Sequence, residues 1–278
     1  MREPLPDGGD SDGRLPGGDP LRSTTPRSAP PLWLGEGLPY VNTGDLSGKL
    51  ITIEGTDSSG RSTQMKGLRE WLEVQGYGVV ETGWTRSELM SEAINVAKAG
   101  HQLNRVTFTL MYAIDFADRL ENQIIPALES GFVVLADRYL YTALARARVR
   151  GIDEEWVRAL YGFAIQPDLV LYLKVDAETL IRRVLQGDGI EYWEAGMDLN
   201  LGEDPYDSFM AYQSRLLDVF DELSGEFGFR IVDGNRSIYE IQQDLRREIR
   251  EFLDLEDTQG GVLEIEEFTR GPATGWSR

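Results

Sequence analysis

The stretch that decides the fold covers residues 50–63 and reads Leu50-Ile51-Thr52-Ile53-Glu54-Gly55-Thr56-Asp57-Ser58-Ser59-Gly60-Arg61-Ser62-Thr63. It fits the phosphate-binding pattern G-x-x-x-x-G-K-[ST] except that Arg61 stands in place of the lysine. The two glycines permit a tight turn that aims backbone N–H groups at a polyphosphate, and the helix that follows presents the positive end of its dipole. We therefore predict an ATP-binding loop made of Gly55, Thr56, Asp57, Ser58, Ser59, Gly60, Arg61, Ser62 and Thr63.

The composition excludes several classes of protein. The chain has 278 residues, no cysteine and one histidine, His101, so neither a disulfide framework nor a histidine-based zinc site or triad is expected. A formal net charge of -19 argues against general nucleic-acid binding. No apolar run is long enough to span a bilayer, and the N-terminus does not resemble a signal peptide. We expect a cytoplasmic protein that does not bind membranes.

The chain divides into three parts. Residues 1–46 are rich in proline, glycine, serine and aspartate and lack an apolar period, so we predict a disordered N-terminal arm in which residues 31–34 provide a local docking point. Residues 47–254 form the domain that contains the loop. Residues 255–278 again lack a period and are predicted to be a C-terminal tail.

Short apolar strands alternate with helical patterns through residues 47–254. The strands are expected at 50–54, 78–81, 132–136, 169–173 and 229–232. Helices are expected to start at residues 62 and 177 and to cover 103–130, 140–148, 154–165, 206–223 and 237–253. This order predicts an α/β fold, a P-loop three-layer sandwich in which a parallel sheet of about five strands has helices on both faces. Ligands then bind at the carboxyl ends of the strands.

The sequence Asp137-Arg138-Tyr139 follows an apolar strand at that ligand-binding edge. We predict that Asp137 orients Mg²⁺ or the acceptor and that Arg138 stabilises the charge of the transferred phosphate. Ser62 is the natural Mg²⁺ ligand of the loop, so Ser62 and Asp137 are the predicted metal residues. Arg61, Asp137 and Arg138 are the predicted catalytic residues.

Three further features allow two interpretations each. Tyr112 either stacks on a base or packs in the core, and Arg119 either reaches phosphate or pairs with a neighbouring carboxylate. Three arginines, Arg146, Arg148 and Arg150, favour a solvated helix face, although in a loop two of them would converge on an anion. The Gly- and acid-rich segment 187–204 has no lysine or arginine, so as a lid it would bring negative charge toward ATP.

Together these residues resemble the thymidylate kinase family of P-loop nucleoside monophosphate kinases, from about residue 48 to 252. The similar pieces are Ile53-Glu54-Gly55-Thr56-Asp57, Leu110-Met111-Tyr112-Ala113, Asp137-Arg138-Tyr139, Pro167-Asp168-Leu169 and Val232-Asp233-Gly234. The resemblance implies that Mg²⁺-ATP donates its γ-phosphate to dTMP or a related (deoxy)nucleoside monophosphate, and it implies a homodimer. It places Asp57 near the acceptor sugar, Tyr112 on its base and Arg138 on its phosphate. We add Arg86, Arg119 and Tyr139 to the predicted substrate-binding residues.

The chain departs from the family pattern at several charged positions, which makes it a divergent member. Arg61 replaces the loop lysine, and Phe116 stands where an arginine usually follows Asp115. The family's transition-state arginine comes either from the loop, where this chain has Ser58, or from the lid, which has no basic residue here. Thr82-Gly83 replaces Thr-Arg, and Arg146-Ala147 replaces a Tyr-Gln pair that helps to read thymine.

These departures keep two alternatives open. One is a catalytically weakened nucleotide-binding or regulatory protein. The other is a polyphosphate-dependent nucleotide kinase, because Tyr141, Arg146 and Arg148 echo the arrangement of that family after its Asp-Arg element. An acidic lid would repel a long polyanion.

Overall fold

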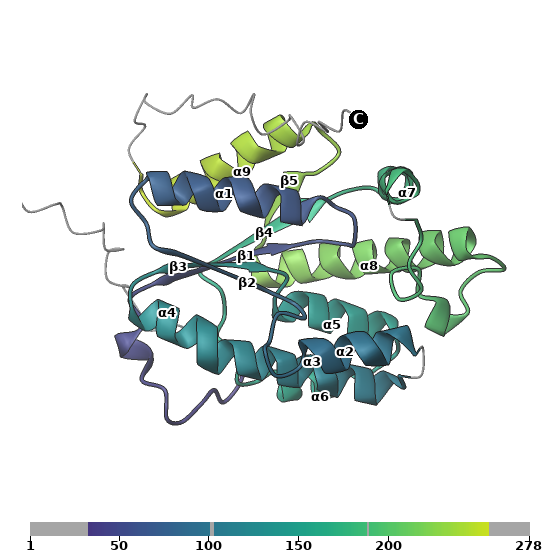
Figure 1. Cartoon of the computed structure of the whole chain (residues 1–278), viewed down its shortest axis with the longest axis horizontal. Coiled ribbons are helices and arrows are strands. Elements are labelled where there is room, and N and C mark those ends of the chain that lie inside the picture. The colour runs from purple at the N-terminus through teal and green to yellow at the C-terminus, as the bar shows by residue number, and fades with distance from the viewer. Residues whose placement is uncertain (1–32, 101–102, 188, 256–278) are drawn as a thin grey trace, which may run out of the picture.

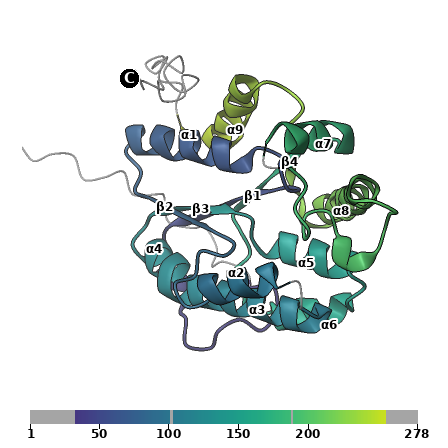
Figure 2. The same cartoon turned by 45° about the vertical axis from the view of Figure 1, so that its right-hand side comes forward.

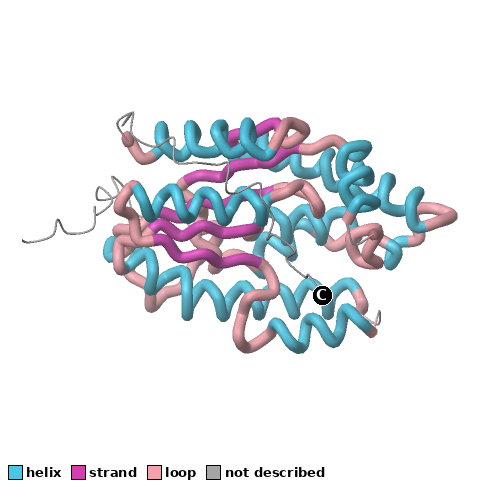
Figure 3. The backbone as a smooth tube through the Cα atoms, turned by 45° about the horizontal axis from the view of Figure 1, so that its top comes forward, coloured by secondary structure: helices cyan, strands magenta, loops and turns pink. Residues whose placement is uncertain are grey.

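A computed structural model describes residues 33–100, 103–187 and 189–255. Five parallel strands form one sheet in the order β2-β3-β1-β4-β5, as predicted (Figure 3). The strands are β1 (Lys49–Glu54), β2 (Val79–Gly83), β3 (Val133–Asp137), β4 (Leu169–Lys174) and β5 (Arg230–Asp233). The single histidine, His101, and most of the predicted C-terminal tail lie outside the described residues.

Helices cover both faces of the sheet, which confirms the three-layer prediction (Figure 1). In the described residues the helices are α1 (Arg61–Val74), α2 (Ser91–Ala99), α3 (Arg105–Arg119), α4 (Ile125–Glu129), α5 (Leu140–Val149), α6 (Glu154–Leu160), α7 (Ala177–Gln186), α8 (Pro205–Phe227) and α9 (Ile238–Phe252). Short turns of helix are η1 (Thr43–Asp45), η2 (Leu120–Ile124) and η3 (Met197–Leu199). No helix among the described residues is long and apolar enough to cross a membrane.

The two faces of the sheet bury separate hydrophobic cores. Helices α1 and α9 pack on one face, where Leu68 and Leu245 meet Ile51 and Leu135. Helices α3, α4, α5 and α8 pack on the other face around residues such as Phe116 and Phe220. Helix α7 packs against α8 beyond the carboxyl ends of β1 and β4 (Figure 2). Because strands with both faces covered must be apolar throughout, the continuous apolar runs of the sequence mark them correctly.

The register of the strands brings three loops together. Asp137, the last residue of β3, pairs with Ile53 of β1 on one side and with Gly83 of β2 on the other. The phosphate loop after β1, the segment after β2 and the Asp-Arg-Tyr turn after β3 therefore start at one edge of the sheet.

Several boundaries differ from the sequence prediction. The helix expected at 103–130 is helical throughout residues 105–129, but η2 is a π-helical turn inserted between α3 and α4. The helix expected at 154–165 stops at Leu160 because the chain then turns through Gly162. Helix α2 was not predicted, since only Ile94 of its residues is buried and one buried residue gives no apolar period.

The described residues include part of the predicted N-terminal arm, from Trp33 onward. Trp33 forms an antiparallel bridge with Ile165, and the backbone N–H of Leu34 donates to the carbonyl of Ala164 at 2.9 Å. Leu46 is buried in the core beneath α4. Trp33 and Leu34, two residues of the predicted docking point, therefore contact the segment after α6, and residues 1–32 lie outside the described residues.

Candidate functional site

The phosphate loop forms the turn that the sequence predicts. Gly55 has φ +149°, and a side chain there would put its Cβ 2.8 Å from the carbonyl oxygen of Leu173 on β4. Gly60 has φ +95° and immediately precedes α1. Both positions favour glycine because of their positive φ, and Gly55 also has no room for a side chain. The loop therefore leads from the buried strand β1 to the N-terminus of α1, where anions bind.

Arg61 turns its guanidinium into this loop. Its Nη1 donates to the carbonyl oxygen of Gly55 at 2.7 Å, to the carbonyl oxygen of Thr56 and to the hydroxyl of Ser59 at 2.9 Å. Its Nε donates to Asp137 at 2.8 Å. Within the described part of the chain Nη2 makes no hydrogen bond, and the side chain is only 6% exposed. Arg61 therefore fixes the shape of the loop, and one of its nitrogens is left to face a phosphate.

The two predicted metal residues lie together. The hydroxyl of Ser62 donates to Oδ2 of Asp137 at 2.9 Å. Burial raises the pKa of Asp137, but the positive charges of Arg61 and Arg138 outweigh it, so the pKa lies below its ordinary value. An ionised carboxylate beside a hydroxyl is the kind of oxygen pair that Mg²⁺ prefers. The residues present fit the ion that the sequence implies.

A second charged cluster joins the loop to α5. Asp57 is 1% exposed, and Nη2 of Arg146 donates to its two oxygens at 2.8 and 2.6 Å, while Nη2 of Arg138 donates to Oδ1. Burial raises the pKa of Asp57, but the two guanidinium groups hold it far below its ordinary value. Nε of Arg138 is buried without a partner among the described residues. Two arginines that share one carboxylate have donors left for an anionic ligand.

Glu54, for which sequence reasoning gave no role, holds the Asp-Arg-Tyr turn. Its buried carboxylate accepts from the backbone N–H of Tyr139 at 2.9 Å and from the hydroxyl of Thr142 at 2.6 Å. Burial raises the pKa of Glu54 above its ordinary value. Arg138, between these contacts, has φ +65°, a conformation that non-glycine residues seldom adopt. Glu54 therefore fixes the strained turn that aims Arg138 at Asp57.

An aromatic pocket adjoins the Asp57 cluster. Tyr112 packs between Trp84 and Phe108, with ring centres 4.5 and 4.7 Å away, and Arg146 lies 5.4 Å from the Trp84 ring. Desolvation by burial raises the pKa of Tyr112. The pocket has a free volume of about 10 Å³, which is room for about one water molecule. A larger group could enter this pocket only if part of the aromatic wall moved.

Three predicted substrate residues lie away from this cluster. Arg119 is fully buried, pairs with Asp115 at 2.9 Å and leaves its Nη2 without a partner among the described residues, so the carboxylate pairing is the interpretation that holds. The ring of Tyr139 packs in the core, 4.8 Å from Phe116. Arg86 is exposed beyond β2 and lines a groove of about 480 Å³ beside Ser62. The structure therefore does not bring these three side chains to Asp57.

The solvated-face prediction for the arginines of α5 is wrong for two of them. Arg146 and Arg150 are 8% and 2% exposed, whereas Arg148 points outward and pairs with Glu222 and Glu154. Residues four apart share a helix face, so Thr142, Arg146 and Arg150 lie on the side that faces Glu54 and Asp57. The four-residue spacing of Thr142, Arg146 and Arg150 was the sequence signal for a shared inward face. It was hard to see because Arg148 lies between the two buried arginines.

Arg183 of α7 is a second residue that sequence reasoning missed. Its Nη1 donates to the carbonyl oxygen of Ser59 at 2.9 Å, and its Nη2 donates to the carbonyl oxygen of Gly234 at 2.7 Å. The side chain thus bridges the phosphate loop and the turn after β5. It brings positive charge to the loop from the helix that precedes the acidic segment.

The acidic segment reaches the Asp57 cluster through Glu194. Burial and the charge of Asp57 raise the pKa of Glu194 to about 7, although Arg146 and Arg138 oppose the shift. The prediction that this segment carries negative charge toward the site is consistent with that position.

Replacing Glu194 with glutamine is expected to stabilise the protein more at about pH 8 than at about pH 5.5. The pKa of Glu194 is raised from 4.5 to about 7, so the folded state binds the proton more tightly and the cost of ionising the half-buried carboxyl appears as pH rises through this window. Thermal unfolding at both pH values measures the difference. The exposed neighbour Glu191→Gln is the control, and an equal effect of Glu194→Gln at both pH values would contradict the assignment.

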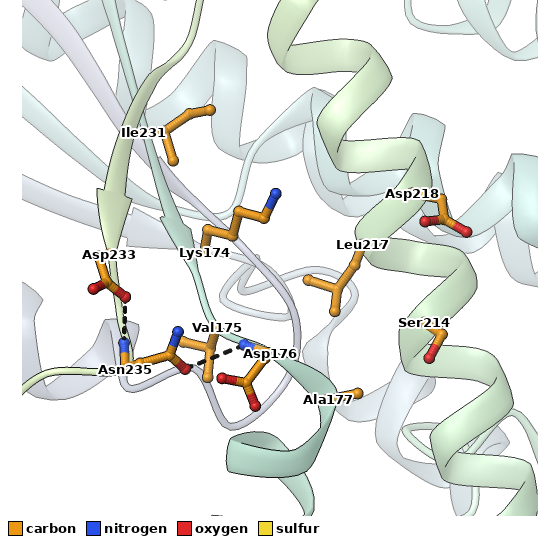
Figure 4. Close-up of a pocket in the computed structure, with 10 residues that line it drawn as sticks. All are labelled: Lys174, Val175, Asp176, Ala177, Ser214, Leu217, Asp218, Ile231, Asp233 and Asn235. Atoms are coloured by element: carbon orange, nitrogen blue, oxygen red, sulfur yellow. Dashed lines mark hydrogen bonds between the residues drawn. The ribbon is translucent and has the colours of Figure 1, made fainter.

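Another groove lies between the carboxyl ends of β4 and β5 and helix α8 (Figure 4). Its volume is about 580 Å³, and Asp176, Asp218 and Asp233 contribute carboxylates to its lining. Lys174, which also lines it, pairs with Asp221 at 2.7 Å. Three carboxylates around one paired lysine do not favour a polyphosphate, so this groove is not assigned to ATP.

Comparison with known proteins gives a consistent result. The family model for thymidylate kinase matches residues 53–245. The chain is 42% identical over 212 residues to a probable thymidylate kinase 2 of Saccharolobus solfataricus. The aligned region covers 75% of this chain and 99% of that protein. It is 33% identical over 215 residues to a thymidylate kinase of Shouchella clausii, covering 74% and 96%, respectively. These matches and the fold agree with the resemblance seen in the sequence, and the chain belongs to the thymidylate kinase family.

Proposed function

We propose that this protein transfers the γ-phosphoryl group of ATP to dTMP or a closely related (deoxy)nucleoside monophosphate. The observation that carries the proposal is the position of Asp57, Arg138 and Arg146 between the phosphate loop and the aromatic pocket around Tyr112. A nucleoside monophosphate has an anionic end and an aromatic end, and this arrangement offers a partner for each.

In the proposed reaction the chain acts by positioning and by charge stabilisation, without a covalent intermediate. The backbone of the loop and Nη2 of Arg61 hold the β- and γ-phosphates. Arg138 and Arg146 hold the acceptor phosphate after it replaces part of their contact with Asp57. Ser62 and Asp137 would hold Mg²⁺, which would neutralise part of the phosphate charge.

Membership of the thymidylate kinase family does not favour the two alternatives. For a polyphosphate-dependent enzyme, Arg148 would have to join the site, but it lies on the outer face of α5 and is paired with glutamates. For the loop to be weakened by loss of its lysine, position 61 would have to lack a cation. Arg61 keeps a cation there, contacts the loop at three oxygens and pairs with Asp137.

The proposal is tested by measuring ADP formation with a panel of acceptors, dTMP, dUMP, CMP and AMP, each with Mg²⁺-ATP. We expect turnover that depends on the acceptor and is fastest with dTMP. Polyphosphate in place of ATP serves as the donor control. Absence of turnover above background with every acceptor would refute the proposal.

We also propose that the protein forms a homodimer through α3. Val106, Leu110 and Ile114 are spaced four residues apart and are 52%, 39% and 46% exposed, so they form an apolar stripe on the outer side of the helix. A second copy is the partner that the family resemblance suggests, and an isologous contact would cover both stripes at once.

The variant Ile114→Asp is expected to convert this dimer to a monomer, because it would place a charge in the centre of the buried stripe. Light scattering coupled to size-exclusion chromatography measures the mass. Val74→Asp adds the same charge at an exposed apolar position of α1, outside the stripe, and should leave the dimer intact. A monomeric wild-type protein would contradict the proposal.

A further inference from the structure

Arg150 is a buried arginine for which the proposed reaction has no role. It follows the last residue of α5 and is 2% exposed. Its side chain lies where α5, α8 and the segment 190–200 meet. We call residues 190–200 the cap segment, because Trp193 packs against Phe108 of the aromatic pocket.

The guanidinium of Arg150 binds the cap segment at two points. Nε and Nη2 donate to the two carboxylate oxygens of Asp198 at 2.9 and 3.2 Å, and Nη2 also donates to the carbonyl oxygen of Trp193 at 3.4 Å. This paired arrangement of two nitrogens and two oxygens is the geometry in which arginine binds carboxylates best.

The rest of the protein holds Arg150 in place for this contact. Nη1 donates to the hydroxyl of Tyr212 on α8 at 2.6 Å. The guanidinium lies 5.1 Å from the ring of Phe108 on α3 and 5.1 Å from the ring of Tyr212. One hydrogen bond and two aromatic rings outside the cap segment thus fix the orientation of the charged group.

The cap segment needs a cation from another element. It contains Glu191, Glu194 and Asp198, and the sequence has no lysine or arginine between Arg183 and Arg215. An acidic segment without its own basic residues gains little from docking on an acidic protein unless a positive charge receives it. Arg150 supplies that charge at Asp198.

The docked cap segment packs against the wall of the acceptor pocket. The ring of Trp193 packs 5.1 Å from Phe108, and its Nε1 donates to the carbonyl oxygen of Lys98 on α2 at 2.9 Å. Trp193, Phe108 and Tyr112 belong to one buried cluster. Displacing the cap segment would therefore remove support from the ring that is predicted to stack on the acceptor base.

We propose that Arg150 is a positioning residue that clasps the cap segment over the acceptor pocket, so that the affinity for the acceptor depends on it and the affinity for ATP does not. The inference rests on the proposed function for its kinetic consequence. The contacts of Arg150 join it to the cap segment, α3 and α8, and none of them involves the phosphate loop.

Steady-state kinetics of the full chain with dTMP and Mg²⁺-ATP test this proposal. We expect Arg150→Ala to raise the KM for dTMP by roughly tenfold to a hundredfold and to change the KM for ATP by no more than about twofold. Arg150→Lys keeps the charge but not the paired geometry, so its KM for dTMP should lie between those of the wild type and Arg150→Ala. Arg148→Ala is the matched control on the exposed face of α5. Equal increases in both KM values, or an unchanged KM for dTMP, would overturn the proposal.

Limited proteolysis provides a readout that does not need turnover. A glutamate-specific protease can cut after Glu191 and Glu194, whereas trypsin has no site inside the cap segment. We expect cleavage there to be about tenfold faster in Arg150→Ala and faster also in Asp198→Asn, with Arg148→Ala unchanged. Wild-type cleavage rates in Arg150→Ala would overturn the clasp. If no acceptor in the panel supported turnover, the proposed function would be refuted. The proteolysis result would then still decide whether Arg150 holds the cap segment.

Discussion

Arg138→Ala is expected to lower kcat/KM for dTMP by about 10³- to 10⁵-fold, the range in which removal of a phosphate-stabilising arginine falls in related phosphoryl transfers. Arg138 shares Asp57 with Arg146, has a buried Nε without a partner among the described residues, and is aimed by a turn that Glu54 fixes. Steady-state kinetics with saturating ATP measure the loss, and circular dichroism checks the fold.

The matched control is Arg148→Ala, which removes an arginine from the neighbouring helix at a position paired with exposed glutamates. Surface ion pairs contribute little, so activity should stay within about twofold of wild type. If Arg138→Ala kept activity within about tenfold of wild type, the role of Arg138 at the acceptor phosphate would be wrong.

The second large effect concerns Arg61. We expect Arg61→Lys to lower kcat/KM by about 10²-fold, although it restores the lysine of the loop pattern. An ammonium group cannot reproduce the set of contacts in which Nη1 binds the loop and Nε binds Asp137. Kinetics of the two proteins under identical conditions provide the measurement. A gain in the lysine variant would mean that the natural loop is impaired and would reverse this account.

Arg61→Ala separates the structural part of this effect. It leaves Asp137 buried without its closest cation, and loss of one partner of a buried pair costs about 3–5 kcal/mol. Chemical denaturation should show a loss of about 3 kcal/mol in the free energy of unfolding, with a smaller loss for Arg61→Lys. An unchanged midpoint for the alanine variant would mean that the ion pair with Asp137 contributes no stability.

The sequence was sufficient for the fold because its apolar runs and glycines act locally. The central strands β1, β3 and β4 are buried on both faces and therefore read as continuous apolar runs, and Gly55 and Gly60 mark a turn that few other residues can make. The pairing of Ser62 with Asp137 was also predictable, since both follow strands that end at the same edge.

The charged part of the site was harder to predict because it depends on which way long side chains point. Arg119 and Arg146 are both arginines on helices, yet one pairs with Asp115 inside α3 and the other reaches Asp57. The difference lies in the helix face and in partners far along the chain, neither of which composition reveals. Arg183 and Arg150 were missed for the same reason, since their partners Ser59 and Asp198 are distant in sequence.

Transfer of label from [γ-³²P]ATP by the wild-type protein tests the central claim most directly, with Mg²⁺ and dTMP present and products separated by chromatography. We predict that the label appears in dTDP, that it requires dTMP, and that Arg138→Ala nearly abolishes it. Label found only in inorganic phosphate, or left in ATP while dTMP stays unchanged, would contradict the account.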